Sequence, residues 1–307
     1  MKLAVIGAAA LWGTAGTAGL LAAGVDPMSL AAARLVFGGL VLVVAARRVL
    51  RLLPRRGLLP LAAVAVAAYQ LCFFAAISRT GVAVGTVVAI GSGPVFTGLL
   101  SWLFDGRRPT GRWAGATAVA VTGCAVLTGG GGQVRLDGVL LALLGGLLYA
   151  FYAVAAARVI GTGAPSDAVM AAMFGGAAVV MLPVLLWTGT AWLAEPRGLL
   201  TALYLGCVAT ALAYVLYGRG LRVTPVATAA TLSLAEPAVA ALLGVAVLGE
   251  RLTLLSTAGL LLLGASLVVV ALPERRTPGR AAGPAGVRDA GDREVAPVGP
   301  HGVERRR

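Results

Sequence analysis

A glutamate and a proline, Glu236-Pro237, interrupt the apolar stretch LSLAEPAVAALLGVAVLGER between Leu232 and Arg251. Glu236 lies about eleven residues into its apolar run, roughly 16 Å along a helix and near the middle of a bilayer. A charged carboxylate that faces lipid there is unfavourable by several kcal/mol, so Glu236 must face the interior of a helix bundle or a wet cavity. Because Pro237 has no N–H, the carbonyl of Ser233 loses its helical partner, and we expect the helix to bend or open there.

Two hypotheses account for Glu236. In the first, it binds a proton or a cation whose occupancy is linked to a substrate, because burial disfavours the charged form of a carboxylate. In the second, it is a protonated residue that fixes helix packing through a hydrogen bond. In the other half of the chain, Pro94 predicts a helix break or kink, and Ser92 could satisfy the backbone groups that it frees.

Arg34 is the arginine that lies clearly inside an apolar run. One interpretation is that its side chain snorkels to the nearby membrane surface. The alternative is that it points into a cavity, where it pairs with Glu236 in one state or binds a substrate carboxylate through two hydrogen bonds. Aromatic and polar residues that either line such a cavity or pack between helices are Trp12, Tyr69, Gln70, Tyr149, Tyr152, Tyr214 and Tyr217.

Membrane helices must hold these residues in place. Hydrophobic residues make up 59% of the chain and charged residues 12%, against roughly 25% charged in an average soluble domain. The apolar runs have the roughly 20 residues that a spanning helix needs, and they lack the alternating pattern of a membrane barrel. We therefore expect an all-α polytopic membrane protein with ten transmembrane helices, at residues 3–23, 29–46, 58–78, 82–104, 113–128, 138–157, 168–188, 199–217, 225–248 and 253–272.

The distribution of basic residues predicts the orientation of these helices. With the N-terminus inside, the cytoplasmic segments before the tail hold twelve Lys and Arg residues, and the opposite segments hold four, Arg79, Arg135, Arg197 and Arg251. Cytoplasmic loops retain Lys and Arg, so both chain ends are expected in the cytoplasm and the net charge of +13 is mostly a topology signal. The alternative for the first apolar run is a signal peptide, because Lys2 precedes the run and small residues follow at Ala22-Ala23-Gly24.

The two halves of the chain resemble each other. Placing Pro94 over Pro237 aligns residues 90–110 with residues 233–253 without a gap. Each half holds five expected spans, an odd number, so the second half must enter the membrane from the opposite side as an inverted repeat. The expected parts are a first five-helix repeat at 1–128, a loop at 129–137, a second five-helix repeat at 138–272, and a disordered basic cytoplasmic tail at 273–307.

Several short motifs add to this plan: AAARLVF near the start of the second helix, GSGPVF at 91–96, AEPA at 235–238, and LGERL at 248–252. With these motifs, the chain resembles a member of the drug/metabolite transporter (DMT) superfamily, in the EamA-like transporter family with two EamA repeats, over residues 3–272. It departs from the family pattern at Arg107, where the repeat often carries Glu. Gly93 also stands in the first half where the second half has Glu236, so the halves are chemically unequal.

The resemblance implies a secondary carrier of the cytoplasmic (inner) membrane of a prokaryote, which exports small organic metabolites or drugs by alternating access. Proton coupling at Glu236 is a hypothesis within it. Arg108, Glu250 and Arg251 lie at expected water boundaries, where anchoring or gating is favoured over substrate contact. A small-solute channel and a membrane protein with a structural or interaction role are the alternatives.

Enzyme and cofactor chemistry are not expected. The sequence has no HExxH, GxSxG or GxxxxGK[ST] motif, and its three cysteines lack metal-ligand spacing. The expected partners are a small-molecule substrate, the lipid bilayer and protons as coupling ion, and no nucleic acid. A homodimer through the Gly81/Gly85 or Gly111/Gly115 spacing is an alternative to packing of these glycines inside the bundle.

Overall fold

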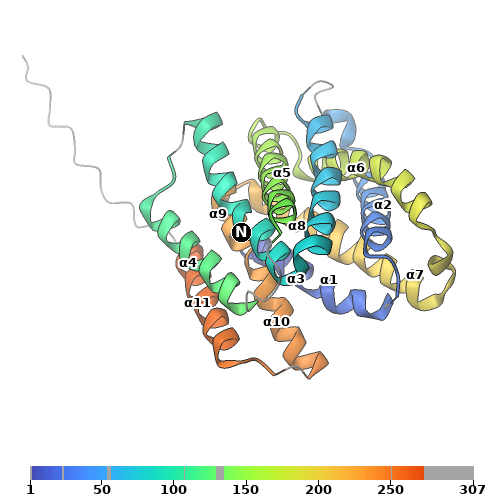
Figure 1. Cartoon of the computed structure of the whole chain (residues 1–307). Coiled ribbons are helices and arrows are strands. Elements are labelled where there is room, and N and C mark those ends of the chain that lie inside the picture. The colour runs from blue at the N-terminus through green and yellow to red at the C-terminus, as the bar shows by residue number, and fades with distance from the viewer. Residues whose placement is uncertain are drawn as a thin grey trace, which may run out of the picture. The chain divides into compact units, whose positions relative to one another are not determined.

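The computed structural model describes residues 2–22, 24–53, 57–106, 108–128, 135–249 and 251–272, and within these ranges it contains helices and no strand (Figure 1). The expected all-α, polytopic architecture is therefore confirmed for this part of the chain. The predictions for the basic tail, most of the inter-repeat loop, Arg107 and Glu250 concern residues outside the described ranges.

The helices follow the apolar runs closely. The first half contains α1 (Lys2–Gly19), the 3-10 turn η1 (Leu20–Ala22), α2 (Pro27–Ala46), the 3-10 turn η2 (Leu50–Leu52), α3 (Leu59–Asp105) and α4 (Gly111–Leu127). The second half contains α5 (Leu136–Gly161), α6 (Ser166–Thr188), the 3-10 turn η3 (Ala191–Ala194), α7 (Pro196–Leu203), the π-helix η4 (Tyr204–Leu212), α8 (Ala213–Leu221), α9 (Val226–Leu232), α10 (Ala235–Leu248) and α11 (Leu254–Ala271).

Nine helical segments of the described chain are long and apolar enough to cross a membrane. Two of them lie within α3, which is interrupted at Gly81, where φ is 80° and ψ is 162°. The expected boundary between the spans 58–78 and 82–104 falls at this glycine, whose backbone conformation L-residues with a side chain rarely adopt. The remaining predicted span, 113–128, forms α4, which has 17 residues and is shorter than the other nine. The count of ten spans thus stays a prediction.

α3 does not break at Pro94, and the kink expected there stays a prediction. Gly81 is the residue of α3 with non-helical backbone angles, and Pro94 lies inside the continuing helix. Nearby hydroxyl groups bind the backbone here, because Thr97 donates to the carbonyl of Gly93 at 2.7 Å and Ser92 donates to that of Ala89 at 3.3 Å. Neither contact reaches the carbonyl of Ile90, which lies four residues before Pro94 and lacks its N–H partner, and α3 continues through this region while it packs against α5.

In the second half, the break before Pro237 is present. α9 ends at Leu232, Ser233 and Leu234 form a turn, and α10 begins at Ala235. The carbonyl of Ser233 accepts from the N–H of Glu236 at 3.0 Å, three residues on, in place of the N–H that Pro237 lacks. Glu236 consequently stands in the first turn of a new helix.

The aligned segments of the two halves share their local structure. Both α3 and α10 end at a glycine with left-handed backbone angles, Gly106 with φ 66° and Gly249 with φ 69°. The helix that follows begins in both cases with a threonine whose hydroxyl accepts from a backbone N–H, Thr110 before α4 and Thr253 before α11. The same helix end and the same helix start therefore recur at positions that the sequence alignment pairs.

The helices pack in pairs that join the two halves. α2 lies against α6, α4 against α11, α3 against α5, and α1 against both α8 and α10 (Figure 1). At one end of the bundle, the Lys2 ammonium donates to the carbonyls of Val270 and Ala271, both at 3.0 Å. α1 also buries Val5 and Trp12 in the common core, so it packs as a member of the bundle.

Candidate functional site

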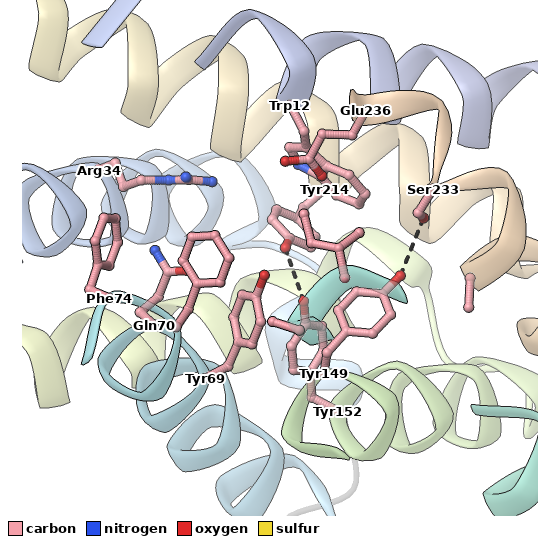
Figure 2. A pocket seen from close by; sticks show the side chains of 14 residues that line it. Trp12, Arg34, Tyr69, Gln70, Phe74, Tyr149, Tyr152, Tyr214, Ser233 and Glu236 are labelled. Carbon is pink, nitrogen blue, oxygen red and sulfur yellow. Dashed lines mark hydrogen bonds between the residues drawn. The ribbon is translucent and has the colours of Figure 1, made fainter. Parts of the chain in front are cut away.

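A cavity of about 80 Å³ lies inside the bundle among residues of α1, α2, α3, α5, α8, α9 and α10 and of the turn between the last two (Figure 2). It is smaller than the roughly 300 Å³ of a pocket for a drug-sized ligand, so in this conformation it suits a small solute or a few waters. Its lining consists of Trp12, Arg34, Tyr69, Gln70, Phe73, Phe74, Ala89, Ile90, Tyr149, Tyr152, Tyr214, Ala230, Ser233 and Glu236.

The structure brings most of the candidates from the sequence together around this cavity. Those that line it are Trp12, Arg34, Tyr69, Gln70, Tyr149, Tyr152, Tyr214, Ser233 and Glu236. Tyr217 does not line the cavity but lies behind it, with its hydroxyl 3.3 Å from that of Tyr149. The sequence reasoning missed Phe73 and Phe74, although Phe73 lies four residues after Tyr69 and therefore on the same helix face.

Glu236 reaches the cavity from the first turn of α10, just after the break at Ser233 and Leu234. Within the described chain, no hydrogen bond or ion pair of its carboxylate is present. The amino end of a helix carries a partial positive charge, which favours a carboxylate in this position. The side chain is half-buried, with its oxygen atoms directed into the cavity (Figure 2).

Arg34 enters the cavity from α2 and lies on the same side as Gln70 and Phe74, at the left in the view of Figure 2. Its Nε donates to the hydroxyl of Thr210 at 3.4 Å, and within the described chain its terminal guanidinium nitrogens make no hydrogen bond. The guanidinium and the Glu236 carboxylate point toward the same space without forming an ion pair among the described residues. The Arg34 side chain therefore points into the cavity and does not extend to the membrane surface.

Tyrosines connect the walls of the cavity. Tyr149 of α5 donates to the hydroxyl of Ser233 at 3.2 Å, at the break between α9 and α10. A second pair, Tyr152 of α5 and Tyr214 of α8, shares a hydrogen bond of 3.2 Å (Figure 2). The Trp12 ring lies 5.0 Å from that of Tyr214, between ring centroids. These contacts hold α1, α5, α8 and the break in one arrangement around the charged residues.

Gly93 allows Tyr149 to take this position. A Cβ atom added to Gly93 would lie 2.9 Å from Cδ1 of the Tyr149 ring, closer than carbon atoms pack. In the aligned second half, the position of Gly93 is occupied by Glu236. The chemical inequality of the halves thus has a structural counterpart, because one half supplies the carboxylate and the other supplies room for an aromatic wall.

Two buried donors in the cavity wall lack a partner in the described part of the chain. They are the indole Nε1 of Trp12 and the amide Nε2 of Gln70. A buried donor without an acceptor is unfavourable by about 1–3 kcal/mol, so such groups are normally satisfied by water or by a ligand. With Arg34 they give the cavity wall three residues that carry donors, while Glu236 offers an acceptor.

The remaining candidates lie away from the cavity. Arg108, near the end of α3, stacks over the Trp102 ring at 5.7 Å from its centroid. Arg251 is exposed between α10 and α11, and Glu250 is outside the described residues. Near Arg108, the carboxylate of Asp105 in α3 pairs at 3.5 Å with Arg158 of α5, which joins the two helices at the end of the bundle.

Comparisons with known proteins agree with the sequence resemblance. The model of the EamA-like transporter family matches twice, at residues 1–129 and 136–272. Bacillus subtilis (strain 168) has a relative, "Uncharacterized transporter YwfM", that is 40% identical over 281 residues, which cover 90% of this chain and 95% of the relative. "Uncharacterized inner membrane transporter YicL" of Salmonella typhimurium (strain LT2) is 29% identical over 292 residues, 89% of this chain and 96% of that protein.

The fold also matches a solved structure. A crystal structure of a protein that is 21% identical aligns with a TM-score of 0.76 over 88% of this chain and 96% of the other. At this identity, the likeness concerns the fold alone.

Proposed function

The chain belongs to the EamA-like transporter family and is a multi-pass bacterial membrane transporter, and from this premise we propose that it is a secondary carrier that exports small organic solutes by alternating access. One observation supports the proposal above all others. Helices of both halves enclose a cavity in which Glu236 and Arg34 point toward the same space, with no ion pair between them in the described chain. Charged groups inside the membrane-spanning part of a protein are energetically unfavourable, so the ones that are present commonly mark a functional site.

The proposed architecture is two inverted five-helix repeats, at 1–128 and 138–272. In it, α4 is the last helix of the first repeat and brings the nine candidate spans to ten. A two-fold relation between the halves would pair corresponding helices with each other, as α2 with α6 and α4 with α11. In this relation α1 corresponds to α5, and α10 corresponds to the second part of α3. The contact between α1 and α10 should therefore recur between α5 and α3, and both pairs of helices are in contact. The shared turns at Gly106 and Gly249 support the same relation.

In the proposed orientation, the start of α1 and the end of α11 both lie on the cytoplasmic side of the membrane of a prokaryotic cell. The contact of Lys2 with the last turn of α11 supports a common side for the two ends. The bias of twelve basic residues against four supports the cytoplasm as that side. Export is proposed from membership of the family.

In the proposed cycle, the two repeats rock around the cavity, and Glu236 binds a proton in one facing state. Protonation removes the negative charge from a cavity that also holds Arg34, and this changes the affinity for a charged solute. A solute that carries both a cationic and an anionic group fits the cavity best. Its anionic group would bind the donors on Arg34, Trp12 and Gln70, and its cationic group would bind Glu236 and the aromatic faces.

Thermal unfolding of the purified protein in detergent, with a panel of solutes at two pH values, tests this function. The panel contains amino acids, monocarboxylates, amines, nucleosides and sugars, because a ligand of the folded state raises its apparent stability by mass action. We expect stabilisation by a solute with both charges, and loss of its pH dependence in Glu236→Gln. If no solute stabilises the wild-type protein at either pH, the cavity is not a binding site in this state and the proposal loses its main support.

A further inference from the structure

The candidate span Pro196–Leu221 contains an unusual helix. Between α7 and α8, within the apolar run Pro196–Leu221, residues Tyr204–Leu212 form the π-helix η4. π-Helical turns are rare and recur at functional sites, because each inserts an extra residue per turn and redirects the side chains that follow. Here, α8 follows η4 directly and carries Tyr214 into the cavity wall.

η4 packs backbone to backbone against α2. A Cβ atom added to Gly38 would lie 2.9 Å from the carbonyl oxygen of Gly206 and 2.6 Å from Cγ2 of Thr210. One added to Gly206 would lie 2.6 Å from Cβ of Phe37. Arg34 precedes Gly38 by one helical turn, so it leaves α2 on the face that touches η4.

Thr210 connects the π-helix to Arg34. Its side chain is fully buried, at 0% exposure, and its hydroxyl donates to the carbonyl of Leu205 at 2.8 Å, five residues back. With its hydrogen committed in this way, the hydroxyl oxygen accepts from Nε of Arg34 at 3.4 Å. The acceptor is therefore oriented by the five-residue spacing of the π-helix.

The choice of nitrogen matters for what Arg34 can bind. Arg34 has five N–H donors in a planar fork, and a contact at Nε leaves the four on the terminal nitrogens for another partner. Because the guanidinium is planar, an acceptor at Nε also sets the direction of the other donors. In the described chain those donors have no protein acceptor, and the group is directed into the cavity.

We propose that Thr210 is a positioning residue, whose hydroxyl in the π-helix η4 aims the Arg34 guanidinium at an anionic group in the cavity. The inference rests on the proposed function only in giving Arg34 a solute to bind. Thr210 touches no solute itself, since it is not among the residues that line the cavity.

The test compares Thr210→Val, which keeps the branched shape and removes the hydroxyl, with Thr210→Ser, which keeps the hydroxyl. Thr201→Val is the matched control, because Thr201 is a buried threonine of the same span whose hydroxyl donates to the carbonyl of Arg197 at 2.8 Å, away from the cavity. Each protein is labelled with 15N at arginine Nε, and the Nε–H signal of Arg34 is assigned by its absence in Arg34→Lys. Sodium acetate, as a minimal carboxylate, is then titrated against this signal.

We expect a hydrogen-bonded, slowly exchanging Nε–H signal of Arg34 in the wild type, in Thr210→Ser and in Thr201→Val. In Thr210→Val, we expect the signal to move to the chemical shift of an Nε–H without a protein acceptor and to exchange faster, while it remains observable at low temperature and low pH. Acetate should shift the signal in the first three proteins with an affinity that is roughly three- to tenfold higher than in Thr210→Val, a range that corresponds to one ordinary hydrogen bond, since the contact to Nε is long. If Thr210→Val keeps the wild-type signal and affinity, the positioning role is wrong. If acetate shifts no signal in the wild type while the Nε–H contrast persists, Thr210 still orients Arg34, and it is the anion-binding part of the proposed function that fails.

Discussion

The contact between α1 and α10 sets the distance across one wall of the cavity, and Gly13→Ala should disturb it. An alanine Cβ at this position would lie 2.7 Å from the carbonyl oxygen of Glu236 and 2.8 Å from Cβ of Val239. Ordinary contacts begin at 3.4 Å, so the helices must part by about 0.7 Å, the difference between 3.4 and 2.7 Å. Overpacking of this kind is unfavourable by roughly 1–3 kcal/mol.

Gly16 provides the matched control on the same helix. A Cβ atom added there meets no atom within 4 Å, so Gly16→Ala introduces no overlap. The substitution should leave stability unchanged or raise it by up to about 1 kcal/mol through better helix propensity. Both variants are unfolded with sodium dodecyl sulfate in mixed micelles and followed by tryptophan fluorescence. Equal free energies of unfolding for Gly13→Ala and Gly16→Ala would refute the packing argument.

Three further predictions concern contacts around the bundle, each measured by the same unfolding titration. Thr231→Val should destabilise by about 1–3 kcal/mol, because it removes the buried partner of the Thr117 hydroxyl at 2.9 Å, and adding Thr117→Val should recover most of the loss; a double variant less stable than the single one contradicts this. Tyr149→Phe should cost about 1–2 kcal/mol through two lost hydrogen bonds, and wild-type stability would show that these bonds contribute nothing. Arg158 and Asp105, with side chains 43% and 33% exposed, should couple by less than about 1 kcal/mol in a double-mutant cycle that weakens with salt, whereas coupling above about 2 kcal/mol would indicate a shielded pair.

Much of the cavity could be predicted from the sequence because its charged members are unfavourable in lipid. Glu236 and Arg34 stand inside apolar runs, and a charge in such a run must turn toward the protein interior or reach the membrane surface. This reasoning limits Glu236 to the interior, and the structure places its side chain in the cavity. It leaves two outcomes for Arg34, because residues near a helix end can reach the surface, and only the tertiary structure distinguishes them.

Other features depend on contacts between distant helices, and no local pattern encodes them. Pro94 predicts a break or kink from its missing N–H, yet the helix continues through it without non-helical backbone angles and packs against α5. The aligned Pro237 does follow a break, so the same residue type gives two outcomes in the two halves. The π-helix η4 has no signature that we recognised in its own sequence, and its close contact with α2 at Gly38 and Gly206 joins residues that are far apart along the chain.

Transport in proteoliposomes under an imposed pH gradient tests the central claim most directly. Wild type and Glu236→Gln are compared, with the solute that gives the largest thermal stabilisation as the transported species. The account predicts saturable flux in the wild type that the gradient accelerates, and flux in Glu236→Gln that no longer responds to it, because the variant has no carboxylate to protonate in the cavity. An identical response of both proteins to the gradient would contradict the proton-coupled carrier and leave Glu236 as a residue of helix packing.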